Sequence, residues 1–134
     1  MLRLVYIFVG LGGVAGSLLR YFLSILSAHF WGSEFPIGTL FINLTGSFFL
    51  GWMTNSLVVP KKLHPYFLTA LTTGVVGSYT TFSTFCYEMV HLFETRKYLF
   101  GLLYMIISLF GGLFFVKAGR KISENGKKEK GRLT

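Results

Sequence analysis

One stretch near the middle of the chain, LTTGVVGSYTTFSTF (residues 71–85), places hydroxyl groups and glycines where a membrane helix is normally apolar. It lies inside an apolar segment over residues 66–90, so a helix there would hold it near the centre of a bilayer. Seven of its residues are Ser or Thr, and Gly74 and Gly77 stand among them. Glycine weakens a helix by about 1 kcal/mol and hydroxyl side chains compete for backbone hydrogen bonds, so the stretch predicts a local break. A broken helix at this depth is tolerated only where protein, a cavity or a bound ion satisfies its carbonyls.

Four apolar segments make up most of the chain, and 52% of its 134 residues are hydrophobic, which is excessive for a soluble domain of this size. The segments cover residues 4–28, 37–59, 66–90 and 98–116. Each is close to the length of about 20 residues that a helix needs to cross a bilayer, and the first is too long for the apolar part of a signal peptide. The sequence therefore predicts an all-α membrane protein of four transmembrane helices, the third broken near its middle, in one domain over residues 1–118.

The basic residues are concentrated near one end of the chain, since seven of the thirteen Lys and Arg residues follow Val116. Such a segment is typical of a cytoplasmic, lipid-facing end rather than of a nucleic-acid-binding surface, and we expect residues 119–134 to form a disordered cytoplasmic tail. Four spans place both chain ends and the second connector on one side. The basic residues of that side are Arg3, Lys61, Lys62, Lys117, Arg120 and Lys121, against Arg96 and Lys97 on the other. This bias predicts a multi-pass protein of the cell membrane with both termini in the cytoplasm.

No residue pattern in the chain indicates an enzyme. The three histidines fall in connectors without the spacing of metal ligands, and the single cysteine, Cys86, has no metal-binding companion. Paired carboxylates, a nucleophile elbow and a phosphate-binding loop are also missing from the sequence. We therefore expect a protein without catalytic activity.

Polar side chains within the spans are the candidates for function. Arg20 either reaches an interface or faces a water-filled space. Asn43 either makes an ordinary hydrogen bond between helices or points its NH2 group at an anion. Glu88, near the end of the third span, is expected to be exposed or hydrogen-bonded.

Aromatic and hydroxyl side chains follow the predicted break. Phe82 and Phe85 are three apart and share a helical face, where they are either packing residues or ring edges against which an anion could lie. Tyr104 and Ser108 are four apart on the last span, either as contacts between helices or as a short track of O–H donors.

Taken together, these motifs resemble the Fluc (CrcB) fluoride channel family. The resemblance rests on GGVAGSLLRY (residues 12–21), PIGTLFINLTGSFFLG (residues 36–51) and GVVGSYTTFSTFCYE (residues 74–88). It covers nearly the whole chain apart from the end of the sequence. Ser78 stands where many relatives have a second glycine, a change that we expect the break to accommodate.

The resemblance implies a passive channel that exports fluoride and so lowers its cytoplasmic concentration. It implies a dimer of two oppositely inserted subunits in the lipid bilayer, with fluoride pores along the subunit interface. The residues implied to line the pathway are Asn43, Phe82, Phe85, Tyr104 and Ser108, then Ser83 and Thr84 as weaker candidates and Arg20 as a vestibule candidate. It also implies a structural Na⁺ ion at the dimer axis, bound by the backbone carbonyls of Gly77 and Thr80 from each subunit.

The partner subunit and two other functions stay open at this point. The charge bias between the two sides favours one orientation, and hence pairing with an oppositely oriented homologue, although a homodimer is the simpler arrangement. A small proton-coupled multidrug transporter also has four helices but needs a carboxylate deep in the first span, where this chain has none. A non-transporting membrane scaffold would explain the glycines but not the hydroxyl-rich break.

Overall fold

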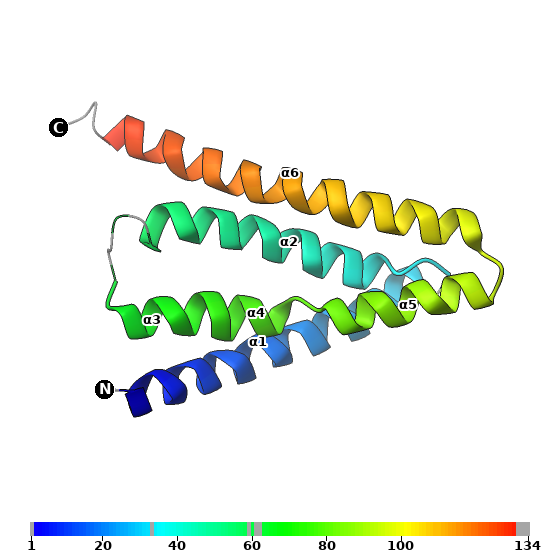
Figure 1. The fold of residues 1–134 in the computed structure, drawn as a ribbon, viewed down its shortest axis with the longest axis horizontal. Coiled ribbons are helices and arrows are strands. Elements are labelled where there is room, and N and C mark those ends of the chain that lie inside the picture. Colours follow the sequence, from blue (N-terminus) through cyan, green and yellow to red (C-terminus); the bar gives the residue numbers. More distant parts are fainter. Residues whose placement is uncertain (1, 33, 59, 61–62, 131–134) are drawn as a thin grey trace.

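The computed structural model describes all residues except 1, 33, 59, 61–62 and 131–134, and it is built of long antiparallel helices (Figure 1). Helix α1 (Leu2–Trp31) is followed by α2 (Ile37–Met53), which continues as a π-helical turn, η1 (Thr54–Val58). The third span comprises α3 (Pro65–Thr69), a second π-helical segment, η2 (Ala70–Val76), then α4 (Gly77–Tyr79) and α5 (Phe82–Glu94). Helix α6 (Tyr98–Lys130) completes the fold. The prediction of an all-α protein is confirmed, since the described residues contain no strand.

Three of the predicted spans are single helices. Within the part of the chain that the structure describes, the helical stretches long and apolar enough to cross a membrane are Arg3–Trp31, Ile37–Val58 and Tyr98–Gly126. The remaining span, predicted over residues 66–90, is divided between α3 and α5 and has its non-helical residues at Thr80 and Thr81. The predicted break is therefore present. It begins three residues after Gly77, which remains helical.

Close backbone contacts hold α1 against the first half of the broken span. A Cβ atom at Gly12 would lie 2.5 Å from the carbonyl oxygen of Ala70, and one at Gly74 would lie 2.8 Å from that of Val9. Only glycine permits this approach, and small residues serve the same purpose wherever membrane helices pack closely. Gly74 thus contributes to packing and does not itself break the helix.

Helix α6 packs along α2 and continues well beyond the predicted end of its span. Glycines mediate this contact as well, since a Cβ atom at Gly119 would overlap the backbone of Phe48. The expected disordered tail is instead helical from residue 119 to Lys130, and residues 131–134 lie outside the described residues. Lys, Arg and Glu favour helix, and an ion pair four residues apart between Arg120 and Glu124 supports it. Ser123 is also hydrogen-bonded to residues of η1, so the extension is anchored to α2.

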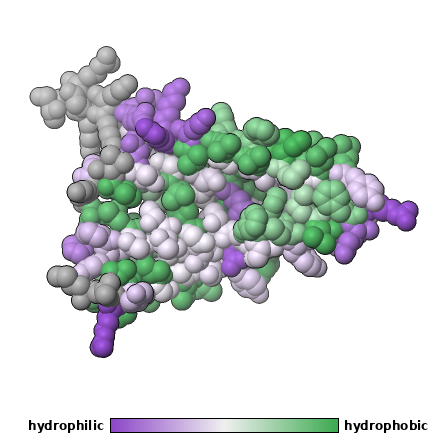
Figure 2. Space-filling view, in the orientation of Figure 1, coloured by the Kyte–Doolittle hydropathy of each residue, from purple (hydrophilic) through white to green (hydrophobic). Residues whose placement is uncertain are grey.

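Large apolar side chains cover the outside of the bundle, and Figure 2 shows them spread over its length with hydrophilic residues gathered toward the two ends. Leu18 on α1 is 63% exposed and Phe114 on α6 is 68% exposed. Apolar surface of this extent is unfavourable in water and suits the hydrocarbon of a bilayer. The fold is that of a multi-pass membrane protein. The polar groups within its membrane-spanning helices are the candidates for a functional site.

Candidate functional site

The break in the third span is formed by two extended residues and a new helix start. Thr80 has ψ 159°, and Thr81 has φ −147° and ψ 125°. The Thr81 hydroxyl oxygen accepts a hydrogen bond from the Thr84 N–H at 3.2 Å, so Thr81 caps α5. Thr81 Oγ1 also donates to Thr84 Oγ1 at 2.9 Å. Threonine is a favoured N-cap because its oxygen satisfies an otherwise unpaired N–H of the first turn.

Asn43 on α2 holds the break from the neighbouring helix. Its Nδ2 donates to the Thr81 carbonyl oxygen at 2.9 Å, and its Oδ1 accepts from the Thr81 N–H at 2.8 Å. One side chain thus satisfies both backbone groups of the residue that leaves the helix. Of the two alternatives for Asn43, the hydrogen bond between spans is therefore observed, and its partner is the backbone of Thr81. An amide nitrogen carries two N–H groups, and in the described part of the chain the second has no partner.

The pairing at Thr81 releases two backbone carbonyls from the helix. In an unbroken helix the Thr81 N–H would donate to the Gly77 carbonyl, but here it donates to Asn43. The Thr84 N–H would likewise donate to the Thr80 carbonyl, but here it donates to the Thr81 side chain. The carbonyls of Gly77 and Thr80 are therefore without their helical donors. Carbonyl oxygens of this kind are the ligands that hard cations such as Na⁺ prefer.

Phe82 and Phe85 follow the break and lie together, as the spacing predicts. Their ring centroids are 5.9 Å apart with the planes at 27°, and the Phe85 ring lies 5.0 Å from that of Tyr104. Phe82 is 78% exposed although it stands in the middle of a span. The three rings form a continuous row from the surface of the bundle to its interior.

A carboxylate and its two hydroxyl donors form a group that the sequence did not reveal. Tyr104 is fully buried, and its hydroxyl donates to Glu88 Oε2 at 2.7 Å. The Thr39 hydroxyl donates to Glu88 Oε1 at 2.7 Å. Glu88 is hydrogen-bonded, which was one of the two expectations, but Thr39 was missed. Glu88 is the only acidic residue in the four predicted spans, and that is the signal in the sequence that points to it.

The remaining predicted residues differ in what their polar atoms contact. The Ser108 Oγ is buried and has no hydrogen-bond partner among the described residues, so its hydroxyl is free to serve a ligand. The Tyr104 hydroxyl, by contrast, is already used by Glu88. Ser83 is exposed, and its Oγ lies 3.4 Å from Thr81 Oγ1. Arg20 is partly exposed, and its Nε is buried and has no hydrogen-bond partner among the residues that the structure describes.

Two hollows that are lined by both polar and apolar groups lie next to the break. One, of about 270 Å³, is lined by Asn43, Ser47, Thr80, Thr81 and Phe82, among others. The other, of about 360 Å³, is lined by Ser24, Ser27, Thr39, Thr84, Glu88 and His91, among others. The cap of α5 separates them, because Thr81 faces the first and Thr84 the second. The arrangement can offer hydroxyl, amide and ring-edge donors to a small anion that moves past the start of α5.

Comparison with known proteins gives consistent matches over nearly the whole chain. A family model described as CrcB-like protein, Camphor Resistance (CrcB), matches residues 7–120. Fluoride-specific ion channel FluC 2 of Geobacillus kaustophilus (strain HTA426) is 44% identical over 126 residues, which cover 94% of this chain and 98% of that protein. Fluoride-specific ion channel FluC 1 of Bacillus cereus (strain ATCC 10987 / NRS 248) is 38% identical over 124 residues, covering 92% and 90%. The protein of the same name from Staphylococcus aureus (strain NCTC 8325 / PS 47) is 39% identical over 117 residues, covering 87% and 94%.

Proposed function

This chain belongs to the CrcB-like family, and on that premise we propose that it is a fluoride-specific ion channel through which fluoride leaves the cell passively. The observation that carries the proposal is the capped break at Thr80 and Thr81, which Asn43 stabilises at the depth of the bilayer. Such a break places hydrogen-bond donors inside the bilayer. Hydrocarbon alone would remove the hydration water of an ion without replacing its hydrogen bonds.

The mechanism follows from the cost of removing water from fluoride. Transfer of a carboxylate-sized ion into a medium of low dielectric has an idealised cost of order 20 kcal/mol, and the smaller fluoride ion loses more hydration. Weak donors in sequence can replace that water without trapping the ion, as conduction requires. The donors we assign to this pathway are the free N–H of Asn43, the hydroxyls of Ser83, Thr84 and Ser108, and the ring edges of Phe82 and Phe85. Tyr104 contributes its ring, since Glu88 occupies its hydroxyl.

The exposed surface at the break supports a dimer. Phe82, Ser83 and Gly77 are exposed in the single subunit although they lie in the middle of a span. Backbone and hydroxyl groups at this depth are stable only when protein covers them. We infer that a second, oppositely oriented subunit packs here, and that the Gly77 and Thr80 carbonyls of both subunits hold a structural Na⁺ ion. The ion would join the two subunits by neutralising carbonyl dipoles that no N–H satisfies.

The charge bias bears on the identity of that subunit. Among the described basic residues, Arg3 stands at the start of α1, and Lys117 and Arg120 follow the apolar run of α6. Arg96 and Lys97 lie between α5 and α6, and this turn is at the opposite end of the bundle from the N-terminus (Figure 1). We propose that the chain inserts with its N-terminal end in the cytoplasm of the cell membrane and pairs with a homologue inserted the other way.

Impermeant thiol labelling of cells that express this chain alone tests the orientation. In a Cys86→Ser background, Glu94→Cys is expected to react from outside, and Gly126→Cys only after permeabilisation. Equal reaction of both sites from outside would show dual insertion and favour a homodimer instead.

Fluoride efflux from liposomes tests the proposed function. The dimer, purified from the chain expressed alone or together with its oppositely oriented homologue, should release trapped fluoride while retaining chloride. A folded dimer of either composition that releases neither halide would contradict the channel and leave a membrane scaffold.

A further inference from the structure

Helix α6 carries a basic surface just beyond its apolar span. Lys117, Arg120 and Lys121 follow directly after Val116, and the side chains of all three are exposed. We propose that these residues form a binding surface for anionic phospholipid headgroups, which the fold holds rigidly at the edge of the bilayer. The inference concerns a surface outside the fluoride pathway and does not depend on it.

Counted along α6 from Val116, where its apolar run ends, these residues fall at headgroup depth. The polar layer of each leaflet is roughly 5–8 Å thick, and an α-helix rises about 1.5 Å per residue, so the layer holds about three to five residues of a helix that crosses it. Residues 117–121 fall within this distance of the apolar span. Lys127 and Lys128 would lie about 17 Å beyond it, which is more than the Debye length of about 8 Å at physiological salt.

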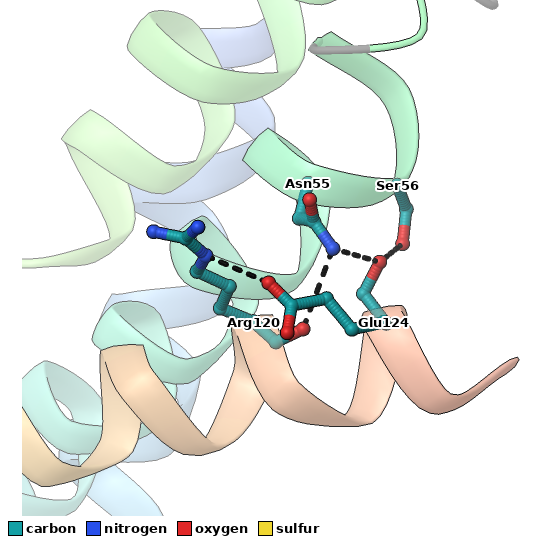
Figure 3. A network of polar contacts seen from close by, with 5 residues as sticks. Asn55, Ser56, Arg120 and Glu124 are labelled. Carbon is teal, nitrogen blue, oxygen red and sulfur yellow. Dashed lines mark hydrogen bonds and ion pairs between the residues drawn. The ribbon is translucent and has the colours of Figure 1, made fainter. Parts of the chain in front are cut away.

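The extension is fixed in orientation by its contacts with α2. Ser123, which is 5% exposed, bonds to the side chains of Asn55 and Ser56 in the π-helical turn η1 (Figure 3). Gly119, one turn earlier, packs against the backbone of α2. Lys117 and Lys121 are four residues apart and lie on the side of α6 turned away from this contact, so they face the surroundings of the protein. A disordered tail would have no such fixed basic face.

An acidic residue limits the charge of this surface. Glu124 Oε1 lies 2.9 Å from Arg120 Nε, in an exposed ion pair that Figure 3 shows along α6. Exposed pairs of this kind contribute little to stability. The main effect of the pair is to offset the positive charge of Arg120 at this surface. Removal of the Glu124 charge should therefore strengthen lipid binding without unfolding the helix.

The chain provides its own reporter for this test. Trp52 on α2 is 38% exposed, and its backbone lies beside Gly119, whereas Trp31, the other tryptophan, is at the far end of α1. In a Trp31→Phe background, quenching of Trp52 by brominated phosphatidylglycerol and by brominated phosphatidylcholine in mixed bilayers gives the relative affinity for the anionic lipid.

We expect a preference for phosphatidylglycerol of about 25-fold at low salt, since Lys117 and Lys121 each contribute roughly a fivefold increase in affinity. The variant Lys117→Gln/Lys121→Gln should lose most of it, Lys127→Gln/Lys128→Gln should keep it, and Glu124→Gln should raise it. Unchanged fluoride efflux confirms that each variant is assembled. Equal affinity for both lipids would overturn the proposal. Equal losses in the two double variants would also overturn it, because they would show that lipid binding depends only on the net charge of the chain and not on the position of the lysines.

Discussion

Replacement of Asn43 by leucine is expected to abolish fluoride efflux and to destabilise the subunit by about 2–6 kcal/mol. The substitution leaves both the N–H and the C=O of Thr81 without partners inside the bilayer. Each unpaired buried group costs about 1–3 kcal/mol, and water is not there to compensate. Efflux from liposomes and denaturation in micelles measure the two effects.

Asn55→Leu is the matched control, because it makes the same chemical change on the same span but at the end that contacts Ser123. It is expected to lower stability while fluoride efflux continues. If Asn43→Leu conducts as well as Asn55→Leu, the break does not depend on Asn43 and its assigned role is wrong.

Substitution of Phe82 or Phe85 by isoleucine should reduce fluoride efflux by at least about tenfold, which corresponds to about 1.4 kcal/mol in the barrier and to the loss of one ring-edge contact. Isoleucine keeps the apolar character but has no electropositive edge. Phe82 is 78% exposed in the subunit, so its replacement leaves no cavity within the subunit. The apolar isoleucine keeps an apolar contact with the second subunit, so assembly of the proposed dimer should persist. Efflux and size-exclusion profiles of the variants are the measurements.

Phe114→Ile serves as the comparison for these variants, since Phe114 is 68% exposed on α6 and is not among the residues assigned to the pathway. Its efflux should equal that of the wild type. Full activity of both Phe82→Ile and Phe85→Ile would show that the two rings are not part of the fluoride pathway.

The spans and the presence of a break could be predicted from the sequence because both follow from local composition. Apolar runs of about 20 residues identify membrane helices, and hydroxyls with glycines at their centre indicate local weakness. The position of the break could not be predicted in this way. Thr81 leaves the helix because Asn43, 38 residues earlier, replaces its backbone partners, and such pairing depends on how two spans lie together.

The hydrogen-bonded group around Glu88 could not be predicted from the sequence for the same reason. A carboxylate in a span is visible in the sequence, but its donors are Tyr104 and Thr39, the latter 49 residues away. Only the packing of α2, α5 and α6 brings them together.

The extension of α6 was wrongly predicted because its charged composition was taken as a sign of disorder. The same residues are good helix formers, and contacts with η1 add the tertiary support that an isolated helix lacks.

We propose that the broken third span creates a donor-lined passage suited to a small, strongly hydrated anion and unsuited to a larger one. The most direct test is the reversal potential of the reconstituted protein in a planar bilayer, with fluoride on one side and chloride on the other. We expect a potential close to the fluoride equilibrium, with permeability favouring fluoride by more than about a hundredfold, or roughly 3 kcal/mol. A potential that places the chloride permeability within about tenfold of that of fluoride would contradict it.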